Sequence, residues 1–121
     1  MSDPSIICAT AEQAILRVVS VKVRRGVDAF VTELERGKSI LRRCGVEANI
    51  RAWLATYAGP ETGALVITLE FADQEAFFRS EQAFAAAPQD DEFQAWSRQL
   101  PEFRSVISDS LHIGLTTPET G

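Results

Sequence analysis

The side chain best suited to proton transfer is His112, the single histidine of a 121-residue chain. Imidazole is the one side chain whose ordinary pKa lies near neutrality. As a general base, His112 would need a place in a pocket and an orienting partner such as Glu47 or Glu70. A lone histidine near the end of a strand is more often a structural or surface residue, so we favour catalysis less.

Side chains suited to binding a ligand gather on two neighbouring segments that alternate like strands. One set of alternating residues in the first segment carries Glu47, Asn49, Arg51, Trp53 and Tyr57. It combines two aromatic rings with hydrogen-bonding groups, as ligand pockets usually do. The alternating residues of 46–58, 64–71 and 103–115 together predict a ligand-binding set. Its members are Asn49, Arg51, Trp53, Tyr57, Thr68, Glu70 and His112. We expect Glu70 to pair with Arg51 across the strands.

Several classes of function have no support in the sequence. There is no Ser/His/Asp set, glycine-rich phosphate loop or cluster of metal ligands, so we expect neither a metal nor a cofactor. Cys8 and Cys44 stand apart and read as free thiols of a reducing cytoplasm. A net charge of −5 disfavours nucleic acid and a membrane surface as partners. The absence of a signal-like start or a long apolar run predicts a cytoplasmic protein.

Hydrophobic periodicity predicts the elements that position these residues. Their order is strand, helix, strand, strand, helix, strand, with Pro88 dividing the second helical region and Pro101 ending it. The expected strands are 14–23, 46–58, 64–71 and 103–115, and the first helix spans 27–44. This is the ferredoxin-like α+β fold, a four-stranded antiparallel sheet with helices on one face. We expect an N-terminal extension over 1–13, one domain over 14–115 and a loose tail over 116–121.

The second face of such a sheet is left without helices, and its use decides the function. The alternation assigns to it Ser20, Lys22, Glu47, Asn49, Arg51, Trp53, Tyr57, Thr68, Glu70, Ser110 and His112. We rank three interpretations: a homodimer interface first, an interface that also encloses a pocket close behind, and a solvated face third. Asp109 falls among the core positions of the last strand, which indicates a β-bulge or a different strand start.

The stretch RAWLATYAGPETGALVITLEFAD, followed by AFF and EFQAW, resembles the dimeric α+β barrel superfamily, with NIPSNAP-like and antibiotic biosynthesis monooxygenase-like members nearest. The resemblance covers about 14–115. It implies that two sheets pack face to face into a barrel, with a pocket for aromatic or polyketide-like molecules or haem. Haem-degrading members use an Asn, a Trp and a helical His. Here Asn49, Trp53 and His112 all lie on predicted strands, so these roles are not transferred.

We therefore expect a homodimer that binds a small apolar or aromatic ligand in a cavity at the sheet face. The first alternative is a cofactor-independent monooxygenase or isomerase that uses His112 with Arg51 or Asn49. The second is a structural dimer with a closed interface and no ligand.

Overall fold

The computed structural model describes residues 13–116 and confirms the ferredoxin-like order of elements. Four antiparallel strands form one sheet in the order β2-β3-β1-β4. The strands are β1 (Ile15–Val23), β2 (Asn49–Leu54), β3 (Leu65–Phe71) and β4 (Arg104–Ile113). The helices are α1 (Val27–Cys44), α2 (Gln74–Ala86) and α3 (Asp91–Phe103), with short 3₁₀ turns η2 (Gly59–Glu61) and η3 (Ala87–Gln89).

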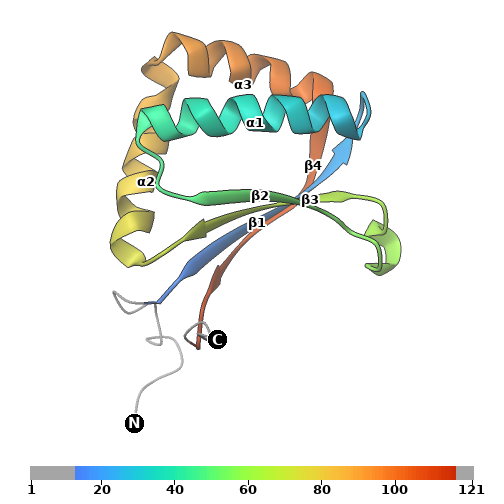
Figure 1. Ribbon diagram of the computed structural model, residues 1–121, viewed down its shortest axis with the longest axis horizontal. Helices are drawn as coiled ribbons and strands as arrows, with labels where there is room; N and C mark the ends of the chain where they lie inside the picture. The colour runs from blue at the N-terminus through green and yellow to red at the C-terminus, as the bar shows by residue number, and fades with distance from the viewer. Residues whose placement is uncertain (1–12, 117–121) are drawn as a thin grey trace.

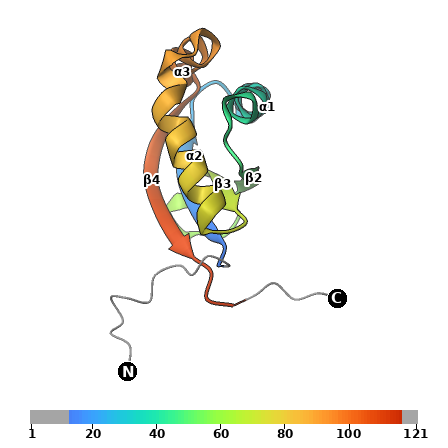
Figure 2. The same cartoon turned by 90° about the vertical axis from the view of Figure 1, so that its left-hand side faces the viewer.

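The helices cover only one face of the sheet. Figure 1 shows α1 and α3 above the sheet, while α2 joins the two layers at one end, and Figure 2 shows the same arrangement from the side of α2. Within residues 13–116, no helix lies over the opposite face, which we call the open face. The core therefore fills the space between the sheet and the helices, where the buried residues include Val21, Phe30, Ile67 and Phe71.

The contact between α1 and α3 depends on a glycine. The indole of Trp96 lies against Gly37, and its Nε1 donates to the carbonyl oxygen of Glu33 at 3.1 Å. A Cβ on Gly37 would lie 2.1 Å from Cζ2 of that ring. Glycine is a poor helix former, but at position 37 it leaves the space into which the indole fits. Trp96 itself is buried.

The second strand is shorter than the predicted 46–58 at both ends. Gly45 adopts the left-handed conformation that ends α1, and the N–H of Val46 bonds to the carbonyl of Leu41, so Val46 completes the helix cap. The N–H of Glu47 donates to Oγ of the fully buried Ser80 at 2.8 Å. Both N–H groups are satisfied by helices, and β2 consequently begins at Asn49.

At its other end β2 stops at Leu54, so Tyr57 lies outside the sheet. The chain closes the hairpin through the N–H of Gly63 and the carbonyl of Ala55, and Oγ1 of Thr62 accepts from the N–H of Ala58. These bonds belong to the loop around η2. Tyr57 extends from this loop and is 99% exposed.

The third helix extends past its predicted stop. Asp90 caps it by accepting from the N–H of Phe93 at 2.9 Å. Pro101 lies inside α3, which continues to Phe103, so the expectation that Pro101 ends the helix is wrong. The proline removes one backbone donor, but in the last turn that leaves only the carbonyl of the exposed Ser97 without its helical partner.

The fourth strand carries the β-bulge that the position of Asp109 indicated. Ser20 is paired with Ser108, while the next residue, Val21, is paired with Val106. Ile107 is therefore the extra residue. Because of it, Val106 faces the helices on the same side as Asp109, which is paired with Val19.

Some expectations fall outside residues 13–116. The extension over 1–13, most of the tail over 116–121, and Cys8 lie outside the described residues. Cys44 is half-buried and has a free thiol. Among the described helices, none has the length and apolar character needed to cross a membrane.

Candidate functional site

The open face holds most of the predicted ligand-binding set in adjacent rows across the strands. One row runs through Asn49, Glu70, Leu16 and His112, and the next runs through Arg51, Thr68, Val18 and Ser110. A third row contains Trp53, Val66, Ser20 and Ser108. The face is thus brought together as expected, with Leu16, Val18 and Val66 forming an apolar centre.

Three side chains of β2 and β3 make a small cluster at one side of that face. The indole Nε1 of Trp53 donates to Oγ1 of Thr68 at 2.8 Å, and the guanidinium of Arg51 stacks 4.0 Å from the centre of the indole ring. The predicted ion pair between Arg51 and Glu70 does not form among the described residues. A cation–π contact holds the arginine instead.

His112 is exposed and lies on the opposite edge of the open face. Its Nε2 is 3.0 Å from Oγ of Ser110, its one polar partner in the described chain. Glu70 lies in the same row but two strands away, about 10 Å at ordinary strand spacing. Within one chain, His112 therefore lacks the carboxylate partner that general-base catalysis would use.

Glu47, the other carboxylate considered for that role, is not on the sheet. It accepts two bonds from Arg79 of α2, at 2.5 Å and 3.1 Å. These bonds lower the pKa of Glu47. Glu47 and Tyr57 are the two members of the predicted face that the structure places elsewhere.

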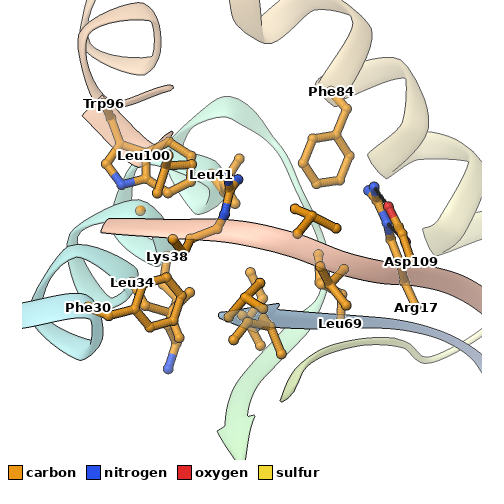
Figure 3. Close-up of a pocket in the computed structure, with 17 residues that line it drawn as sticks. Arg17, Phe30, Leu34, Lys38, Leu41, Leu69, Phe84, Trp96, Leu100 and Asp109 are labelled. Atoms are coloured by element: carbon orange, nitrogen blue, oxygen red, sulfur yellow. Dashed lines mark hydrogen bonds and ion pairs between the residues drawn. The ribbon is translucent and has the colours of Figure 1, made fainter. Parts of the chain in front are cut away.

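A cavity lies on the other side of the sheet, between the four strands and the three helices (Figure 3). Its volume is about 220 Å³, room for roughly seven water molecules at liquid density. Most of its lining is apolar: Val19, Val21, Phe30, Leu34, Leu41, Ile50, Ile67, Leu69, Phe84, Trp96, Leu100 and Val106. Val106, on the edge strand, is 49% exposed, so the cavity opens to solvent along β4.

An ion pair forms one wall of this cavity. Nε and Nη2 of Arg17 donate to the two carboxylate oxygens of Asp109 at 3.0 Å and 2.6 Å, and Figure 3 shows the pair facing Trp96 and Leu100 across the space. The paired hydrogen bonds raise the pKa of Arg17 and lower that of Asp109. Asp109 is consequently a poor proton acceptor at neutral pH.

The sequence interpretation missed this cavity because it treated that side of the sheet as solid core. A signal was present: Arg17 shares the alternation of Val19, Val21 and Val23, and Asp109 shares that of Leu111 and Ile113. Opposite charges at core positions of two strands that pair indicate an ion pair beside a space large enough to hold it. Arg104 and Lys38 also line the cavity.

The fold can be compared with that of known proteins. No family model and no curated protein sequence matches the chain, but solved structures do. The chain has the fold of the dimeric α+β barrel proteins.

Three structures illustrate the likeness. A NIPSNAP-like domain protein from Burkholderia xenovorans matches with a TM-score of 0.59 and 19% identity over 93% of this chain and 91% of that one. A NIPSNAP family protein from Agrobacterium tumefaciens gives 0.62 and 13%, over 94% and 95%. SnoaB, a cofactor-independent oxygenase from Streptomyces nogalater, gives 0.57 and 18%, over 88% and 98%. At these identities the likeness establishes the fold alone.

Proposed function

We propose that the protein is a homodimer that binds a small, largely apolar molecule. The main support for this proposal is the cavity between the sheet and the helices, which is lined by apolar side chains and open along β4. Concave, mostly apolar sites with a few polar groups are the usual form of a small-molecule site. The proposed ligand site lies on the helix side of the sheet, whereas the sequence led us to expect it at the open face.

The open face supports the homodimer. Its apolar centre is bordered by Trp53, which remains 43% exposed although its Nε1 is bonded to Thr68. The fold is that of the dimeric α+β barrel proteins, and a face-to-face partner would remove this patch from water.

The test of the dimer is a native mass spectrum of the wild type and two matched variants. Trp53→Glu places a charge on the open face, whereas Phe78→Glu places one on α2, where Phe78 is 54% exposed. We expect a dimer for the wild type and for Phe78→Glu, and a monomer for Trp53→Glu. A monomeric wild type, or equal behaviour of the two variants, would overturn the proposed interface.

The test of the ligand site is the thermal midpoint with a panel of small aromatic and aliphatic compounds. A ligand that binds the folded state raises the midpoint. Val106→Trp fills the mouth of the cavity and should abolish the rise. Val31→Trp, at an exposed position of α1, should leave it unchanged. Failure of every compound to shift the wild-type midpoint would favour a structural dimer without a ligand.

The likeness to SnoaB supports a second candidate, a cofactor-independent oxygenase. Of the titratable side chains that line the cavity, Asp109 is bonded to Arg17, and Arg17, Lys38 and Arg104 are cations. His112 lies on the opposite face of the sheet. This distribution favours binding over proton abstraction, and turnover that is lost in His112→Ala would reverse that preference.

A further inference from the structure

The charged groups that line the cavity are unequal in sign. Among the residues of the described range 13–116 that line it, Arg17, Lys38 and Arg104 are cationic and Asp109 is the one carboxylate, which leaves two positive charges in excess. The whole chain carries a net charge of −5, so the cavity differs in sign from the molecule around it. In a site walled by apolar side chains, such an excess attracts an anion.

Two of the three cations already have partners. Arg17 makes its two bonds to Asp109. Nζ of Lys38 lies 3.0 Å from a carboxylate oxygen of Glu35, one turn earlier on α1. The excess of positive charge at the cavity wall therefore falls on Arg104.

Arg104 has no side-chain hydrogen bond, ion pair or ring contact with any residue in the described range 13–116. It is the first residue of β4, opposite Val23, and its N–H bonds to the carbonyl of Leu100 where α3 ends. Its side chain is half-buried, and burial lowers the pKa of Arg104 because no anion offsets the lost hydration. The guanidinium is a planar fork of donors that fits a carboxylate with two parallel bonds.

We propose that the ligand is an amphipathic carboxylate, whose apolar body fills the cavity and whose carboxylate pairs with Arg104. This rests on the ligand site proposed above and specifies the chemistry it accepts. A volume of about 220 Å³ restricts the body to a single ring or a short chain. Aromatic acids and short fatty acids have this form.

The experiment compares acids with their uncharged amides. Benzoate, phenylacetate and hexanoate are titrated against benzamide, phenylacetamide and hexanamide by calorimetry, with the wild type, Arg104→Met and Arg98→Met. Arg98 is the matched control, because it is an exposed arginine on α3 that does not line the cavity. The unliganded thermal midpoint of each variant reports whether it folds.

We expect at least one acid to bind the wild type about tenfold or more tightly than its amide. A tenfold difference in affinity is what a pair of charge-assisted hydrogen bonds to the guanidinium would contribute. Arg104→Met should lose that ratio while keeping its affinity for the amide, and Arg98→Met should keep it. Arg104→Lys retains the charge without the fork and should bind with intermediate affinity. This variant also serves as the test if Arg104→Met does not fold.

Two other outcomes separate the inference from the function on which it rests. Equal binding of acid and amide, unchanged in Arg104→Met and lost in Val106→Trp, would overturn the carboxylate and leave the ligand site intact. Binding of no compound at all would overturn both. Acid binding that is weakened equally by Arg98→Met and Arg104→Met would indicate attraction by overall charge and would also refute the pairing with Arg104.

Discussion

Gly37→Ala is expected to destabilise the protein, although alanine is the better helix former. In an open helix the change would stabilise by about 1 kcal/mol. Here the new Cβ would lie 2.1 Å from Cζ2, 2.6 Å from Cε2 and 2.9 Å from Cη2 of Trp96, where carbon atoms ordinarily rest about 3.5–4.0 Å apart. The indole or the helix must therefore move by more than an ångström.

The size of the effect follows from what that movement disturbs. Overpacking of a filled core costs about 1–3 kcal/mol, and displacement of the indole also weakens its bond to the carbonyl of Glu33, worth about 1 kcal/mol. After the gain in helix propensity, we expect a net loss of about 2 kcal/mol. In a domain of this size that lowers the thermal midpoint by roughly 8 °C.

The assay is urea denaturation followed by far-ultraviolet circular dichroism, together with a double-mutant cycle. In a Trp96→Leu background the six-membered ring of the indole is gone, so Gly37→Ala should be neutral or slightly stabilising there. The coupling energy between the two positions isolates the steric contact. If Gly37→Ala stabilises the wild type by the helix-propensity value, then the close approach of Trp96 to Gly37 is refuted.

Two further predictions concern polar contacts. Ser80→Ala removes the fully buried hydroxyl that accepts from the N–H of Glu47, a part-buried bond, and should cost about 1 kcal/mol in urea denaturation. The exposed Ser97→Ala should cost little, and equal effects of the two changes would contradict this. Asp90 accepts from Arg43 and from the N–H of Phe93, which holds the pKa of Asp90 well below its usual range. Its contribution to stability is present above the ordinary carboxyl pKa near 4 and is lost as the pH falls through the folded value. Denaturation midpoints of Asp90→Asn should therefore fall less steeply between pH 5 and 2 than those of the wild type, and parallel curves would exclude the linkage.

The fold could be predicted because its signals are local and repeat along the chain. The alternation in β1 and β3 and the spacing of apolar residues in α1 agree with the structure almost to the residue. The ends of β2 could not be predicted in this way. The N–H of Glu47 bonds to Ser80, 33 positions further on, and no pattern within the strand reports that contact.

The candidate site also has a part that the sequence predicts and a part that it does not. The open face was predictable, since the parity of a strand assigns its residues to one side, and the structure keeps Asn49, Arg51, Trp53, Thr68, Glu70 and His112 there. Whether the space on the other side is full depends on how α1, α2 and α3 meet, which is a property of three separate helices. The sequence indicated that space only through charges at core positions.

The β-bulge links the strand register to the cavity. Val106 and Asp109 are three positions apart, so in a regular strand they would point to opposite faces. The extra residue Ile107 places both opposite helix-facing residues of β1, Val21 and Val19. As a result Val106 forms the mouth of the cavity while Asp109 reaches Arg17 in its wall. That ion pair occupies the one carboxylate at the cavity, and the guanidinium of Arg104 is left for a carboxylate that the ligand supplies.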